Sequence, residues 1–261
     1  YEERKRSNQT TFNITALYSL SYLLLYPISK KTFTDYRMIS CVHSFYTFRR
    51  GRPTLTHKVV NDLKDVSMLS TKKQWEYAGS IALVYKNQKY IFGEIDYVTS
   101  ERKNTVSVES TWMSVLCYHT HPGIVYTGIV SDKELFATLP SDADFTAYIV
   151  GYPIIQSNII CDAHGYYVID IIDSIEKFKS PLPEAVNKVM KDFRDRPYLR
   201  EHVFGDSGCE YFCTTLNDWK STINIELNHL LSRTFGITIK YYGYNEDPAT
   251  ITVNQESVDY L

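Results

Sequence analysis

Two histidines one residue apart end an apolar stretch of the chain, in the order Cys117-Tyr118-His119-Thr120-His121-Pro122. Successive side chains of a strand point to opposite faces, so His119 and His121 project to the same side if this stretch is extended. Two imidazoles on one face, joined by an acid from another segment, supply three ligands for zinc and leave its fourth position open. Such an open site is typical of hydrolytic zinc enzymes.

The candidate third ligand is Asp144, in the run Leu139-Pro140-Ser141-Asp142-Ala143-Asp144. Residues 141–150 predict a helix, with Ser141 or Asp142 as its N-cap. Ser141 precedes Asp144 by one helical turn and therefore lies on the same face. Its hydroxyl can hydrogen-bond the oxyanion of a tetrahedral intermediate.

A water-activating site also needs a general base outside the set of metal ligands. We choose Glu76, at the entrance of a predicted strand, Tyr77–Tyr85. Glu94, on the next predicted strand, is the alternative base.

Three short motifs, Glu76-Tyr77-Ala78-Gly79, His119-Thr120-His121-Pro122 and Ser141-Asp142-Ala143-Asp144, together resemble the JAMM motif of the MPN (JAB) metalloproteases. That family carries a Glu on an early strand, often followed by x-x-Gly, then H-x-H-P and S-x-x-D. The resemblance covers residues 56–173. It implies that His119, His121 and Asp144 bind Zn2+, that Glu76 is the acid/base, and that Ser141 stabilises the oxyanion.

The same resemblance implies a hydrolase, a zinc-dependent metalloprotease or isopeptidase of the deubiquitinase kind. Its substrate would be a protein or peptide, with ubiquitin and ubiquitin-like modifiers among the candidates. The family also includes catalytically dead scaffold members. The alternative function is therefore a scaffold or assembly protein of a larger complex, such as a viral or phage particle.

The spacing of the motifs departs from the family. Nineteen residues separate His121 from Ser141, where the family usually has seven. Ser131 and Glu134 lie closer to that spacing and offer an alternative pair. We prefer Ser141 and Asp144 because residues 139–148 read as a cap followed by a helix, and because prokaryotic-type members carry Pro-Ser-x-x-Asp after variable loops. Residues 123–140 are then expected to be a long loop, forming a flap over the site.

The wider pattern predicts an α+β fold (α/β/α-like), with a mixed, curved sheet flanked by helices. Three segments are expected: a basic N-terminal arm at 1–55, the MPN/JAMM-like domain at 56–173, and a mainly helical C-terminal extension at 174–261. A cluster of Gly, Pro and Arg at 49–53 predicts a linker or turn between the first two. The predicted elements are helices at 57–69, 141–150, 183–193 and 211–235, hairpins at 77–98 and 158–172, and strands at 113–121 and 237–242.

The distribution of charge narrows the classes of partner that the chain is expected to bind. Residues 1–60 carry ten Lys/Arg against three acids, a charge of +7, so the remainder of this chain of net charge −2 carries −9. A basic arm can dock on an acidic partner, but it lacks the interleaved aromatic residues of a nucleic-acid platform, so nucleic acid is not expected. The apolar run at 16–28 is too short to span a bilayer. Five scattered cysteines favour a reducing compartment, the cytoplasm or nucleus.

Overall fold

The structure of the protein is a computed structural model that describes residues 50–99, 101, 116–124, 134–152, 155–172, 182–199, 202–204 and 210–254. The chain divides into two compact units, Tyr1–Phe45 and Tyr46–Leu261, and all described residues belong to the second. Most of the predicted basic arm, including the apolar run at 16–28, lies outside the described residues.

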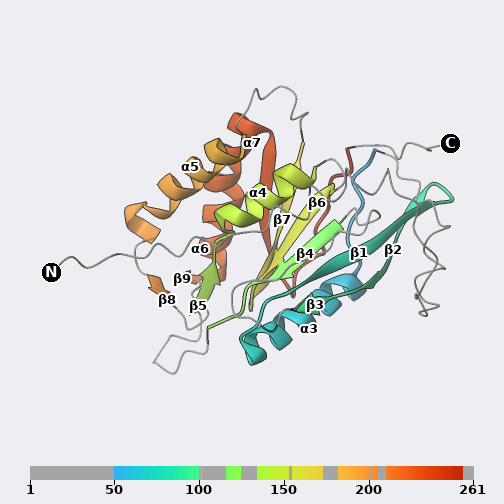
Figure 1. Ribbon diagram of the computed structural model, residues 1–261, viewed down its shortest axis with the longest axis horizontal. Coiled ribbons are helices and arrows are strands. Elements are labelled where there is room, and N and C mark those ends of the chain that lie inside the picture. The colour runs from blue at the N-terminus through green and yellow to red at the C-terminus, as the bar shows by residue number, and fades with distance from the viewer. Residues whose placement is uncertain are drawn as a thin grey trace, which may run out of the picture. The chain divides into compact units, whose positions relative to one another are not determined.

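A mixed, curved sheet forms the centre of the second unit (Figure 1). Its strands lie in the order β10-β7-β6-β4-β1-β2, and the short β3 also pairs with β1. Strands β4 and β6 are parallel, and the other paired strands of this sheet are antiparallel. The bounds are β1 (Tyr77–Lys86), β2 (Lys89–Ile95), β3 (Val98–Thr99), β4 (Leu116–Thr120), β6 (Ser157–Cys161), β7 (Gly165–Ile171) and β10 (Ile237–Gly243).

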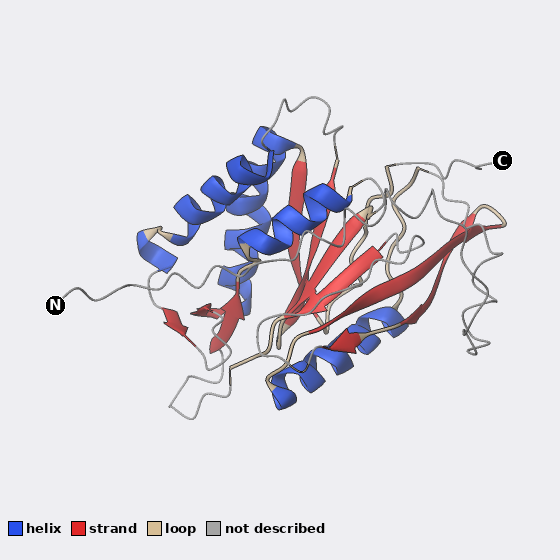
Figure 2. Ribbon diagram, viewed as in Figure 1, coloured by secondary structure: helices blue, strands red, loops and turns tan. Residues whose placement is uncertain are grey.

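A second, smaller sheet has the order β5-β9-β8 and is antiparallel. Its strands are β5 (Glu134–Thr138), β8 (His202–Phe204) and β9 (Glu210–Thr215). The helices are shown in Figure 2. They are α3 (His57–Lys73), α4 (Asp142–Gly151), α5 (Leu182–Arg194), the 3-10 turn η2 (Pro197–Leu199), α6 (Leu216–Ser221), the π-helix η3 (Thr222–Leu227) and α7 (Asn228–Phe235).

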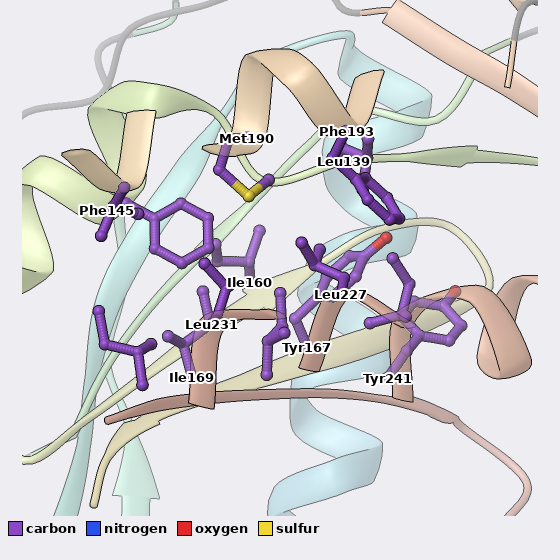
Figure 3. Packing of buried hydrophobic residues seen from close by; sticks show 14 of the residues in the cluster. Leu139, Phe145, Ile160, Tyr167, Ile169, Met190, Phe193, Leu227, Leu231 and Tyr241 are labelled. Carbon is purple, nitrogen blue, oxygen red and sulfur yellow. The ribbon is translucent and has the colours of Figure 1, made fainter. Parts of the chain in front are cut away.

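Strands β6 and β7 of the large sheet are buried on both faces, because every residue along them is buried. Along β7, Tyr167 and Ile169 pack into one core with α4, α5 and the α6–α7 region, as Figure 3 shows. Tyr166 and Val168, at the alternate positions of β7, point to the opposite face and pack into a second core with α3. The result is a helix, sheet, helix layering, which confirms the α+β prediction at this coarse level.

Several predicted elements are confirmed. Helix 57–69 is α3, which begins at the N-cap Thr56 and continues to Lys73. The hairpins at 77–98 and 158–172 are β1–β2, with β3 following, and β6–β7. Helix 183–193 is α5, and strand 237–242 is β10. The predicted strand 113–121 is β4, which ends at Thr120, while residues 113–115 lie outside the described residues.

Two predictions are wrong in part. The expected loop 123–140 contains the strand β5, while residues 125–133 lie outside the described residues. The expected helix 211–235 begins only at Leu216, because Tyr211–Thr215 belongs to β9. The apolar residues after 216 have helical spacing, and the prediction extended this helix backwards to 211. Residues 211–215 are mostly aromatic or β-branched instead, and they pair with β5.

The predicted linker at 49–53 is also wrong in its described part. Gly51 exchanges two backbone hydrogen bonds with Val253, both of 2.9 Å, and the Leu55 N–H donates to the Ala249 carbonyl at 2.8 Å. Leu55 and Val253 are buried in the core that contains α3. Residues 51–55 therefore form part of the packed unit.

The C-terminal part shares its core with the predicted catalytic domain. Strand β10 pairs with β7 along its whole length. Trp219, Leu227 and Leu231 pack in the same cluster as Ile160 and Tyr167. The structure thus places 56–173 and the described residues after 173 in one compact unit.

None of the described helices combines the length and the apolar character needed to cross a lipid bilayer.

Candidate metal centre

The end of β4 presents both histidines to one face of the large sheet. Leu116 and Tyr118 point into the core against α3. His119 and His121, at the alternate positions, therefore project to the opposite face, where α4 begins. Their Nε2 atoms lie 3.2 Å apart.

The backbone after β4 is held by bonds to distant parts of the unit. The His121 N–H donates to the Cys161 carbonyl at 2.7 Å, and the Tyr211 hydroxyl donates to the Pro122 carbonyl. The next residue, Gly123, donates to Thr71 Oγ1 at 2.9 Å and accepts from the side chain of Gln74 at 2.8 Å, both near the end of α3.

Asp144 reaches the histidines from the first turn of α4. Its Oδ1 lies 3.1 Å from His119 Nε2, and its Oδ2 lies 3.3 Å from His121 Nε2. Ser141 is the N-cap of this helix and forms a capping box with Asp144. The Ser141 N–H donates to Asp144 Oδ2 at 2.6 Å, and the Asp144 N–H donates to Ser141 Oγ at 3.2 Å. The cap therefore fixes the rotamer that aims the carboxylate at the histidines.

The charge state of Asp144 suits a ligand. Burial alone would raise the pKa of this carboxyl, but His119 and His121 outweigh burial and hold the pKa well below its usual range. The carboxylate is thus ionised at neutral pH.

His119, His121 and Asp144 can together hold a metal ion. Zinc–ligand bonds of about 2.0–2.1 Å in tetrahedral geometry place neighbouring ligand atoms about 3.3 Å apart. The Nε2 atoms of the two histidines, 3.2 Å apart, match this spacing, while the two Asp144 oxygens lie 3.1 and 3.3 Å from Nε2, each from a different histidine. Two imidazoles and one carboxylate are also a ligand set of catalytic zinc sites, which keep their fourth position open.

Strand pairing brings Glu76 to the same place. Ala78 pairs with His119 in the antiparallel ladder of β1 and β4, so two residues earlier Glu76 falls opposite His121. Tyr77 N–H donates to Thr120 Oγ1 at 3.0 Å, which extends the contact between these segments beyond the ladder. Opposite residues of such a pair project to one face.

The half-buried Glu76 carboxyl has an unusual pKa, raised from 4.5 to about 7. Burial is the main cause, and the negative charge of Asp144 adds to it, while His121 acts in the opposite direction. A carboxyl with a pKa near neutrality can both accept and return a proton.

The two alternative residues that the structure describes lie elsewhere. Glu94 is exposed on β2, and its charge acts on Lys58 at the start of α3. Glu134 is exposed at the start of β5, opposite Thr215. Ser131 lies outside the described residues. The structure thus brings together Glu76, His119, His121, Ser141 and Asp144.

Two further residues support the segments that carry the site: Thr138, which the sequence analysis did not single out, and Gly79, the glycine of the first motif. Thr138, at the end of β5, places its Oγ1 3.2 Å from His121 Nδ1. Gly79 allows the main chain at Asp96 to cross close to β1, because a Cβ at this position would lie 1.8 Å from the Asp96 carbonyl oxygen. The x-x-Gly after Glu76 was a visible signal for Gly79, whereas no local pattern marks Thr138.

Comparison of the chain with models of protein families, with curated proteins and with solved structures finds no match.

Proposed function

We propose that this protein is a zinc-dependent hydrolase that cleaves peptide or isopeptide bonds, with its active site at His119, His121, Asp144 and Glu76. One observation carries the proposal: His119, His121 and Asp144 can together hold a metal ion, and the register of β1 and β4 brings the Glu76 carboxyl opposite His121. Zinc held by the three ligands would polarise the scissile carbonyl and lower the pKa of a water molecule.

Glu76 is the proposed general acid and base. It lies outside the ligand set, directly before β1 and opposite His121, and its raised pKa fits both halves of the proton transfer. It takes the proton from the attacking water and delivers it to the leaving amine.

Ser141 is the proposed oxyanion donor. Its oxygen accepts the hydrogen bond from the Asp144 N–H. This bond uses a lone pair of the hydroxyl and leaves its hydrogen to be donated to the developing oxyanion. The same residue caps α4 and, in this proposal, also donates to the oxyanion.

The resemblance to the JAMM motif supports the choice of substrate class, a protein or peptide amide, with ubiquitin-type isopeptides as the first substrates to test. It also supports zinc over other metals. The two imidazole ligands agree with that choice, because imidazole suits zinc better than it suits magnesium or calcium.

The test combines elemental analysis with hydrolysis of isopeptide-linked diubiquitin and of a mixed peptide library. We expect about one zinc per chain in the wild type and in Glu76→Gln, and none in His121→Ala. Hydrolysis should fall by about 10²–10⁴-fold in Glu76→Gln, while the matched control Glu94→Gln stays at the wild-type rate.

Full activity of Glu76→Gln would overturn the assignment of the base, and zinc retained by His121→Ala would overturn the metal site. Zinc binding without hydrolysis of any substrate would support the scaffold alternative.

A further inference from the structure

The end of β5 lies directly against His121. Thr138 is 2% exposed, and its side-chain oxygen is 3.2 Å from His121 Nδ1. Strand β5 falls within the nineteen residues that separate His121 from Ser141, and it pairs with β9, where Thr138 lies opposite Tyr211. The long spacing therefore contains a residue that touches a candidate ligand.

Two buried residues, Trp219 and Tyr167, hold the position of Thr138. The Trp219 indole N–H donates to the Tyr167 hydroxyl at 2.7 Å, and that hydroxyl donates to the Thr138 carbonyl at 2.6 Å. An indole can only donate, so the Tyr167 oxygen must accept from Trp219 and use its own hydrogen for the carbonyl. Burial raises the pKa of Tyr167 and keeps that hydrogen in place.

The contact with Thr138 engages Nδ1 of His121 and leaves Nε2 on the side of the candidate metal site. A neutral imidazole carries one proton, and the ring presents Nε2 to His119 and Asp144. Metal binding at Nε2 requires the proton to sit on Nδ1, where a buried N–H needs an acceptor. Thr138 Oγ1, 3.2 Å away, can accept that hydrogen bond.

We propose that Thr138 is a positioning residue: with a metal on Nε2, it accepts the hydrogen bond from Nδ1–H of His121 and so keeps Nε2 aimed at the metal. This inference rests on the metal site of the proposed function, and it assigns a role to part of the segment between the two motifs. The residues from Trp219 through Tyr167 to Thr138 form the support, so the C-terminal part of the chain contributes to metal affinity.

The experiment measures zinc affinity by competition with a chromophoric chelator in four proteins. Thr138→Val keeps the side-chain shape and removes the acceptor, and Thr138→Ser keeps the hydroxyl. The control Thr238→Val removes a hydroxyl on β10 that donates to the Asp170 carbonyl, three strands away from β4 in the sheet order. We expect a 10–100-fold loss of affinity in Thr138→Val, and values within about threefold of wild type in the other two.

A second readout, proton NMR of the zinc-loaded protein, should show a slowly exchanging Nδ1–H of His121 in wild type and Thr138→Ser. In Thr138→Val this Nδ1–H should exchange faster with water. Wild-type affinity in Thr138→Val, or an equal loss in Thr238→Val, would overturn the inference while leaving the metal site intact. A wild type that binds no zinc would instead overturn the proposed function and this inference with it, a result distinct from either of those.

Discussion

Ser141 has two roles that one pair of substitutions can separate. As N-cap, its hydroxyl accepts from the Asp144 N–H, and as proposed oxyanion donor it uses the hydroxyl hydrogen. Ser141→Ala removes both roles and leaves the cap unsatisfied, which costs about 1 kcal/mol. Ser141→Gly also removes the hydroxyl, but glycine is tolerated at an N-cap for only a few tenths of a kcal/mol.

For a unit of this size, about 1 kcal/mol lowers Tm by about 2–4 °C. We therefore expect this drop in Ser141→Ala and almost none in Ser141→Gly. Losing an oxyanion donor costs about 10²–10³-fold in kcat, so both variants should lose that much activity. Ser141→Thr keeps both roles and serves as the control.

The assays are thermal or urea unfolding and kcat on the substrate found by the screen. Near-normal kcat in Ser141→Gly would refute the catalytic role, because the residue would then act only as a cap. An equal loss of stability in the alanine and glycine variants would refute the capping argument.

Two further results are expected. Gly79→Ala should destabilise the protein by about 3 kcal/mol or more in urea unfolding, because the added Cβ would lie 1.8 Å from the Asp96 carbonyl oxygen. The control Gly243→Ala, whose Cβ would have its nearest neighbour at 3.4 Å, should be tolerated. Equal stability of the two variants would contradict the clash. In the metal-free protein, the pKa of Glu76 is about 7 in the folded state and 4.5 in the unfolded chain. Between these pH values the folded state therefore keeps a proton that the unfolded chain has released. The free energy of unfolding should then fall, by at most about 3 kcal/mol, as pH rises from 4.5 to 7, and Glu76→Gln should remove that part of the slope; parallel pH profiles would contradict it.

Local patterns were enough to predict the elements that carry the site. The strand-like patterns along 77–98 and 158–172 were enough to predict two hairpins. In each hairpin a short turn joins two strands that pair with each other, so the pairing is local in the sequence. The predicted cap at Ser141 is confirmed because capping depends on residues only three apart. The grouping of the two histidines with Asp144 followed from motif order.

The small sheet could not be predicted, because its stability is not local. The strands β5 and β9 are separated by more than seventy residues, and each is only five or six residues long. Neither segment shows the alternation of a half-buried strand, and Tyr211–Thr215 adjoins a helical pattern. Thr138 was missed for the same reason, since its contact with His121 depends on this pairing.

The long connection between His121 and Ser141 is compatible with the site because contacts with the rest of the unit, rather than the length of this connection, fix the geometry of the site. The backbone after β4 is tied to α3, to β6 and to Tyr211 of β9. Asp144 is aimed by its own capping box, and the start of α4 is held by Arg194, which donates to Asp142 at 2.9 Å and to the Pro140 carbonyl at 3.2 Å. Most of the contacts that position each half of the candidate ligand set therefore lie outside the segment that joins them. A longer connection costs little closure entropy, which grows only slowly with length, and here it adds a strand that contacts a ligand.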